Sequence, residues 1–155
     1  SVNDDVMGGV STSEIYATEN ALNFSGEVST DNNGGFVSLR SPNDEYELSD
    51  YTQIEVSYKS SGQDFTMILA DQAVWYMPEF KHELFPINDG WTTVTTSLSE
   101  FTQYKMTNYG EIATDVDLSE EILSEVIRIE LRNSEFANGD FQLEIDYIEF
   151  QGFVD

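Results

Sequence analysis

Hydrophobic and polar residues alternate with a period of two along most of the chain. The alternation is strict in three segments, Ile54–Lys59, Ile127–Arg132 and Phe141–Asp146. This pattern places apolar side chains on one face of a half-buried β-strand and polar side chains on the other. A less regular form of it predicts six further strands: Glu14–Ala17, Ala21–Phe24, Phe36–Arg40, Phe65–Leu69, Glu83–Ile87 and Trp91–Thr96. The chain is therefore predicted to be mostly β.

Short turn segments separate these strands, and helical signal is scarce. The turns are rich in Asn and Gly: Asn32–Gly35, Ser61–Gly62, Asn88–Gly90 and Asn138–Asp140. One helical turn is predicted at Ser119–Leu123, where Ser119 can cap the first turn and two acidic residues follow it. Many short strands at close spacing predict an antiparallel sandwich or barrel with at most one short helix.

The organisation predicted is a single domain covering residues 1–155, because the sequence contains neither an internal repeat nor a linker. The segment Thr102–Asp117 has no clean period and is predicted to be a long surface loop. Long loops often carry function, so this segment is a candidate contributor to a site.

The charge balance narrows the classes of partner. The 155 residues include six Lys and Arg against thirty Asp and Glu, a net charge of −24. So few basic residues exclude a surface for nucleic acid or for anionic membranes. The apolar runs are too short for a membrane-spanning helix. The acids are dispersed, which favours a solvated surface compatible with a saline environment. An acidic face for a cationic partner or a metal is the alternative, and the compartment is not specified.

The sequence contains no recognisable catalytic motif, and among thirty acids a pair of carboxylates carries no signal for catalysis. The chain has no Cys and a single histidine, His82, with no G-x-S-x-G segment to accompany it. The pairs Gly8–Gly9 and Gly34–Gly35 lack the strand–loop–helix context of a phosphate-binding loop. We therefore expect a binding domain and not an enzyme.

Three glycine-containing blocks resemble one known family. They are Asn3–Ser11 (NDDVMGGVS), Phe24–Gly26 (FSG) and Asn32–Arg40 (NNGGFVSLR), followed near the end by Gly139–Ile145 (GDFQLEI). These blocks, in this order, resemble the complex I intermediate-associated protein 30 family. In the opening block, the family usually has Gly at the position where this chain has Asp5.

The resemblance implies a fold and a function. The fold is a jelly-roll β-sandwich of two antiparallel sheets, of the galactose-binding-like type found in several carbohydrate-binding modules. The function is non-enzymatic, since mitochondrial members of the family act as assembly chaperones. We therefore expect a protein-assembly or interaction factor with a protein partner. A carbohydrate-binding module is the alternative.

The resemblance also implies a place for a metal. Related carbohydrate-binding modules hold a structural calcium where the first and last strands lie close together. Here Asp4 and Asp5 stand near the start, and Asp146 stands in the last predicted strand. The apolar residues Ile148 and Phe150 follow Asp146 on its own face, so partial burial of its carboxylate is expected. A buried carboxylate must be paired, hydrogen-bonded or metal-bound. Structural calcium and a cap on backbone amides both stay open, and no other cofactor is predicted.

Aromatic residues in polar stretches are the candidates for ligand binding. Trp75 and Tyr76 lie in a polar segment before a proline, and Tyr104 and Tyr109 lie in the predicted loop. Exposed rings of this kind can stack on sugar faces, although large aromatics are more often buried in a core. Arg40 closes the block Asn32–Arg40 and could either pair with a nearby acid or bind a ligand carboxylate.

Overall fold

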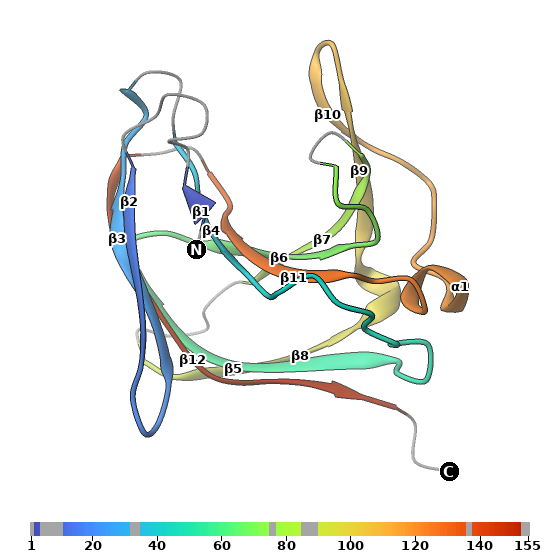
Figure 1. The fold of residues 1–155 in the computed structure, drawn as a ribbon, viewed down its shortest axis with the longest axis horizontal. Coiled ribbons are helices and arrows are strands. Elements are labelled where there is room, and N and C mark those ends of the chain that lie inside the picture. Colours follow the sequence, from blue (N-terminus) through green and yellow to red (C-terminus); the bar gives the residue numbers. More distant parts are fainter. Residues whose placement is uncertain are drawn as a thin grey trace.

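The computed structural model describes residues 2–3, 11–31, 35–74, 77–84, 90–135 and 138–152. These residues form two antiparallel sheets packed face to face (Figure 1). The seven-stranded sheet has the order β1 (Val2–Asn3), β4 (Val37–Arg40), β11 (Arg128–Asn133), β6 (Phe65–Ala70), β7 (Glu79–Leu84), β9 (Thr102–Thr107) and β10 (Gly110–Ala113). The five-stranded sheet has the order β2 (Thr12–Ala17), β3 (Leu22–Val28), β12 (Gly139–Gln151), β5 (Gln53–Ser61) and β8 (Thr92–Ser97). The predicted jelly-roll sandwich is confirmed.

Helical structure is limited to two short pieces. The 3-10 turn η3 (Leu98–Glu100) leads from β8 into β9, and α1 (Glu120–Leu123) precedes β11. The predicted cap of α1 is present, because the Ser119 side chain accepts a hydrogen bond from the Ile122 amide. No helix in the described part of the chain is long and apolar enough to cross a membrane.

The core fills the space between the sheets. Three buried rings form its centre: Phe24 lies 5.0 Å from Phe141 and 6.2 Å from Phe65, centroid to centroid. Aliphatic side chains from both sheets complete the core, and each contributes roughly 1.5–3 kcal/mol by leaving water. Alternation along β6, β7 and β11 sends every other side chain to the opposite, outward face of the seven-stranded sheet.

The last strand contains an irregularity that changes which face its residues occupy. In β12, Ile145 pairs with Tyr58 and Tyr147 pairs with Ser57, so Asp146 is the additional residue of a β-bulge. The bulge reverses the alternation, and Ile148 therefore packs inward against the core. Asp146 is exposed, so the expectation of its partial burial was wrong.

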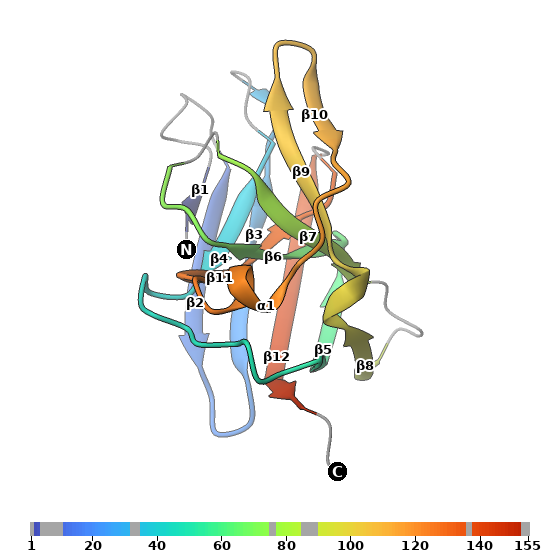
Figure 2. The ribbon, with the colours of Figure 1, turned by 90° about the vertical axis from the view of Figure 1, so that its right-hand side faces the viewer.

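The segment predicted as a long loop, Thr102–Asp117, is mainly a hairpin, so that prediction was also wrong. Strands β9 and β10 pair antiparallel, with Tyr104 opposite Ala113 and Thr107 opposite Gly110. The hairpin projects beyond the sandwich (Figure 2). The tight turn closes because the Thr107 hydroxyl donates to the Gly110 carbonyl at 2.6 Å and accepts from the Tyr109 amide at 3.1 Å.

A second turn depends on a glycine. Gly62, which follows β5, has a φ of +85°, a conformation that L side chains rarely adopt. A side-chain carbon at this position would collide with the carbonyl oxygen of Asp140 on β12. Only glycine therefore allows the β5–β6 turn to lie against β12.

Candidate binding groove

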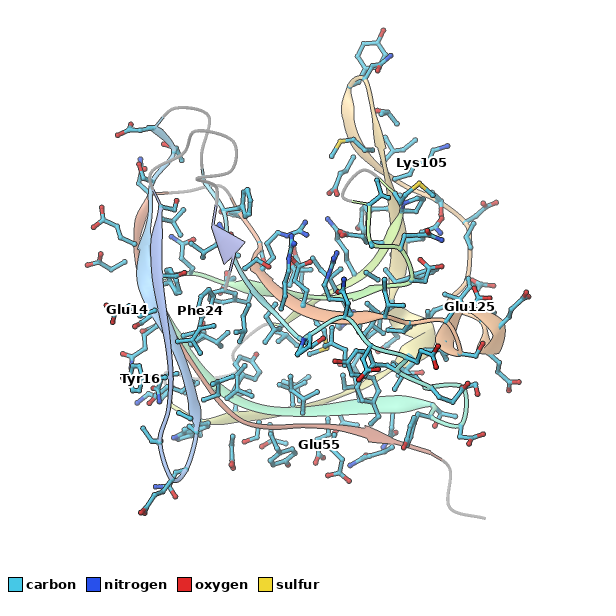
Figure 3. All side chains as sticks on the ribbon, viewed as in Figure 1. Glu14, Tyr16, Phe24, Glu55, Lys105 and Glu125 are labelled. Atoms are coloured by element: carbon cyan, nitrogen blue, oxygen red, sulfur yellow. The ribbon has the colours of Figure 1, made fainter. Side chains whose placement is uncertain are left out.

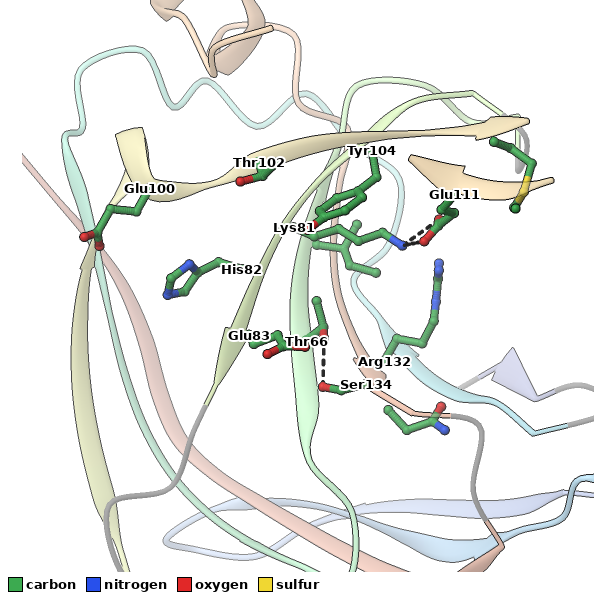
Figure 4. Close-up of a pocket in the computed structure, with 14 residues that line it drawn as sticks. Thr66, Lys81, His82, Glu83, Glu100, Thr102, Tyr104, Glu111, Arg132 and Ser134 are labelled. Atoms are coloured by element: carbon green, nitrogen blue, oxygen red, sulfur yellow. Dashed lines mark hydrogen bonds and ion pairs between the residues drawn. The ribbon is translucent and has the colours of Figure 1, made fainter. Parts of the chain in front are cut away.

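A groove runs along the outward face of the seven-stranded sheet. Its volume is about 730 Å³. The floor is formed by β6, β7 and β11, and the β9–β10 hairpin rises along one side (Figure 1). The side chains that define it are shown in Figure 4: Thr66, Lys81, Glu83, Thr102, Tyr104, Glu111, Arg132 and Ser134.

Strand register brings these side chains together from distant parts of the sequence. Thr66 on β6 faces Arg132 on β11 and Glu83 on β7 across the ladder. Lys81 on β7 pairs with Thr102 on β9. Paired residues project to the same face of a sheet. A mainly polar surface therefore forms on the side away from the core, with Ile68 of β6 as an apolar residue within it.

The outward face concentrates the few basic residues of the chain. All three arginines, Arg40, Arg128 and Arg132, project from it together with Lys81. Its described strands also carry four acids, Glu79, Glu83, Glu111 and Glu130. Four positive and four negative charges balance, and the whole net charge of −24 lies elsewhere on the chain. Figure 3 shows labelled acids Glu14, Glu55 and Glu125 on other sides of the molecule.

Glu130 is the centre of a buried ion-pair network. Its fully buried carboxylate accepts from Arg40 Nε at 2.7 Å, from Arg132 Nη2 at 2.8 Å and from the Ser38 hydroxyl. Burial by itself would raise the pKa of Glu130, but the charges of Arg132 and Arg40 outweigh burial and lower it. Glu130 is therefore ionised and fixed in position.

Glu79 completes the network from β7. Its carboxylate lies 3.4 Å from Arg128 Nη2 and 3.6 Å from Arg132 Nη2. Because these contacts are longer, they offset the cost of burying the Glu79 charge less well than the contacts of Glu130 do. Burial therefore raises the pKa of Glu79. The buried Nε atoms of Arg128 and Arg132 have no hydrogen-bond partner among the described residues. The floor thus retains donor capacity that its own carboxylates do not use.

The wall of the groove is tied to its floor by Lys81. The Lys81 ammonium donates to both carboxylate oxygens of Glu111 on β10, at 2.7 and 2.9 Å. It also lies 5.7 Å from the ring centroid of Tyr104, within range of a cation–π interaction. Tyr104 is half-buried, with its ring at the side of the groove (Figure 4).

The predicted ligand residues are only partly brought together. Tyr104 lines the groove. Tyr109, at the hairpin tip, is 100% exposed and is not part of the lining. Arg40 lies on β4, the strand next to the groove floor, and pairs with the carboxylate of Glu130 on β11. Trp75 and Tyr76 lie outside the described residues.

The predicted metal site gains no support from the described part of the chain. Asp4 and Asp5 lie outside it, and Asp146 is exposed on the bulge of β12. Strands β1 and β12 belong to different sheets. Among the described residues, no three acids or histidines are grouped so as to hold a metal ion. The calcium site stays a prediction.

Several groove residues were not singled out from the sequence, Lys81, Glu111 and Arg132 among them. The sequence does contain a signal for Arg132. Arg128, Glu130 and Arg132 alternate with apolar residues and therefore share one face of a predicted strand. A face bearing three charges in a row is a candidate for a polar site.

Comparison with solved structures identifies the fold. The family 11 carbohydrate-binding module of a cellulosomal cellulase from Clostridium thermocellum is similar over 96% of this chain and 85% of its own, with a TM-score of 0.65 and 18% identity. A family 11 module from Clostridium thermocellum in complex with a β-1,3-1,4-mixed-linked tetrasaccharide is similar over 94% of this chain and 84% of its own. The TM-score is 0.62 and the sequence identity is 20%. An exo-β-agarase gives a TM-score of 0.54 at 13% identity, over 94% of this chain and 23% of its own.

Sequence comparison gives the family. No curated protein sequence matches the chain. The family model of complex I intermediate-associated protein 30 matches residues 1–145, nearly the whole chain. The chain therefore belongs to the complex I intermediate-associated protein 30 (CIA30) family.

Proposed function

We propose that this domain is a non-catalytic binding module whose groove on the seven-stranded sheet holds a neutral glycan chain. The observation that carries the proposal is the groove itself, which is lined mainly by polar and charged side chains of both signs and bordered by the ring of Tyr104. The solved structures of similar fold include carbohydrate-binding modules, one of them in complex with a tetrasaccharide.

The chemistry of the groove suits sugar hydroxyls. Each hydroxyl donates one hydrogen bond and accepts others, so a glycan needs donors and acceptors side by side. Arg132 and Lys81 supply donors, Glu83 and Glu111 supply acceptors, and the hydroxyls of Thr66 and Ser134, 2.8 Å apart, supply both. A volume of about 730 Å³ is within the usual range for sites of bound small molecules.

The charge distribution favours a neutral glycan over an anionic one. The basic side chains of the groove are already paired with carboxylates, Lys81 with Glu111 and Arg132 with Glu130. The remaining surface carries the net charge of −24, which repels anions on approach. A sulfated or carboxylated glycan would therefore meet a higher barrier than a neutral one.

A panel of neutral oligosaccharides, the mixed-linked β-1,3-1,4 tetrasaccharide and agaro-oligosaccharides among them, tests the proposal by calorimetric titration. Loss of one sugar–aromatic stacking contact should weaken binding about tenfold, so Tyr104→Ala should show that loss. The matched control is Tyr16→Ala on β2, an exposed tyrosine of the other sheet, which should bind like the parent. Equal affinity of both variants, or binding of anionic glycans alone, would contradict the proposal.

The same titration addresses the predicted calcium. Repeating it with calcium and with EDTA separates a metal-dependent site from the groove, which uses side chains alone. Binding that is abolished by EDTA and unchanged in Tyr104→Ala would transfer the site to Asp4, Asp5 and Asp146.

A second candidate function is protein assembly, the role implied by the family. One observation favours it: an apolar cleft opens at a different place, between the edges of the two sheets. A cleft of that kind suits a polypeptide better than a sugar.

A further inference from the structure

Strand β8 forms one edge of the five-stranded sheet. It pairs with β5 over all six of its residues, from Thr92 opposite Tyr58 to Ser97 opposite Gln53, without a bulge. In the described part of the chain, no other strand pairs with β8. Its outer edge is therefore a row of main-chain groups that the sheet itself does not use.

The hydrogen bonds between β8 and β5 show which main-chain groups point outward. The Leu98 amide donates to the Thr52 carbonyl at 2.9 Å, and these two residues are directly opposite in the register of the pair. Bonded and non-bonded pairs alternate along an antiparallel ladder, so Thr96 and Val94 also bond to β5. The N–H and C=O groups that point to the outer edge are those of Thr93, Thr95 and Ser97.

This edge lacks the features by which natural proteins protect an exposed strand. Protected edge strands are very short or carry charges, prolines or bulges. β8 has six regularly paired residues, and the chain has no charged residue and no proline from Gly90 to Ser99. β10, an edge strand of the other sheet, has only four residues, and one of them is Glu111. A further strand can therefore pair with β8.

The distribution of charge indicates a second copy of this chain as the partner. With a net charge of −24, two copies repel wherever acids of one face acids of the other. Two β8 strands can meet antiparallel about a two-fold axis at Thr95, which then lies opposite Thr95 of the second copy. In that register Thr93 lies opposite Ser97 and Val94 lies opposite Thr96, so no charges face each other. Cross-strand pairs of Thr and Ser stabilise neighbouring strands. A basic segment, in contrast, would find no acid on β8 itself.

The acid closest to this contact on the neighbouring strand is screened at physiological salt. Glu55 on β5 lies opposite Thr95. In the paired state, three strand spacings separate Glu55 from Glu55 of the second copy, which is roughly 14 Å. The Debye length is about 8 Å at physiological ionic strength and about 30 Å at 0.01 M. Repulsion between the two carboxylates is therefore weak in physiological salt and strong at low salt.

We propose that two copies of this domain associate through β8, which joins their five-stranded sheets into one sheet of ten strands. The contact is small, because it consists mainly of one six-residue strand from each copy, so the dimer dissociates on dilution. The inference is independent of the glycan groove, which lies on the other sheet.

Sedimentation equilibrium of the full chain tests the association, at protein concentrations from about 10 μM to about 1 mM. The mass should rise with concentration from that of one chain toward that of two. The dissociation constant should be about tenfold lower in about 0.5 M than in about 0.05 M NaCl, because salt screens the acids. The mass of one chain at every concentration and salt would overturn the proposal.

Two lysine variants separate strand pairing from general charge repulsion. Thr95→Lys places two like charges opposite each other at the two-fold axis and should weaken the dimer at least about tenfold, although it reduces the net negative charge. Ala113→Lys makes the same change of charge on β10, the edge strand of the other sheet, and is the matched control that should associate at least as tightly as the parent. Undiminished association of Thr95→Lys would refute pairing through β8.

Amide exchange on the unmodified protein gives a readout that needs no variant. As the protein concentration rises, exchange at Thr93 and Thr95 should slow, because their N–H groups gain partners in the second copy. The amides of Val94 and Thr96 should be protected at every concentration, because they bond to β5. Association without slower exchange at Thr93 and Thr95 would place the contact elsewhere and contradict the proposal.

Discussion

Glu130→Gln removes the negative charge at the centre of the buried ion-pair network. In the parent protein the carboxylate accepts from Arg40, Arg132 and Ser38 and is fully buried. An isolated charge-assisted hydrogen bond contributes about 1.5–3 kcal/mol. The three bonds share one acceptor group and do not add, and the variant also leaves two arginines without their main counter-charge. We expect a loss of about 3–5 kcal/mol in the free energy of unfolding, the range for breaking a buried ion pair.

Urea unfolding followed by circular dichroism measures this loss, and the melting temperature should fall by roughly 10 °C for a domain of this size. Glu111→Gln is the matched control. Its pair with Lys81 is partly exposed, so its removal should cost less than about 1 kcal/mol. A difference of less than about 1 kcal/mol between the two variants would refute the view that the network on this face is a buried, stabilising unit.

The effect of Glu130→Gln should also depend on pH. Because the folded-state pKa of Glu130 lies below its ordinary value of 4.5, the stabilisation is complete above pH 4.5. It is lost as the pH falls through the folded-state pKa, where the carboxylate takes up a proton. The stability difference between parent and variant should therefore be constant near neutrality and shrink in acid. A difference that grew in acid would contradict the assigned direction.

Three further predictions concern Glu79, Gly62 and the surface charge. Burial raises the pKa of Glu79, so the parent should lose stability relative to Glu79→Gln as the pH rises from 4.5 through the folded-state pKa of Glu79. Urea unfolding of both proteins at several pH values measures this difference. Gly62→Ala should cost at least about 2 kcal/mol, since it adds a collision with β12 to an unfavourable φ, whereas Gly110→Ala, with φ +105° and open space around it, should cost only about 1–2 kcal/mol. The melting temperature should rise between low salt and about 0.5 M NaCl, because screening relieves repulsion among the acids, and a fall would contradict a dispersed, self-repelling surface.

Strand prediction from alternation succeeded where one face of a strand meets the core. Ile129 and Leu131 on β11 pack inward while Arg128, Glu130 and Arg132 face outward, and the sequence of this strand alternates accordingly. The hairpin β9–β10 has no such signal. Met106 and Ile112 on its two strands are both about half exposed, because the hairpin extends beyond the sandwich and neither of its faces meets the core.

The bulge at Asp146 could not be predicted from alternation. An additional residue in one strand shifts the pairing by one position, and only the partner strand, β5, reveals it. Strict alternation without a bulge places Asp146 on the same face as Ile148 and Phe150 and predicts that it is buried. With the bulge, Ile148 and Phe150 pack against the core and the carboxylate of Asp146 is exposed to solvent.

The groove was beyond prediction for a related reason. Tyr104 could be selected as an aromatic residue in a polar segment, but Lys81, Arg132 and Glu111 come from three other strands. They become neighbours only through the strand order of the seven-stranded sheet. Single-strand patterns indicate which side of a sheet a residue occupies, and not which distant strand lies beside it.

The central claim, that the groove on the seven-stranded sheet is a glycan site, is tested most directly by titrating the isotope-labelled protein with the neutral oligosaccharide panel and following backbone amide shifts by NMR. The account predicts saturable shifts for Lys81, Tyr104 and Arg132, with the amides of β2 and β8 on the other sheet unchanged. Shifts confined to the five-stranded sheet, or none for any sugar in the panel, would contradict it.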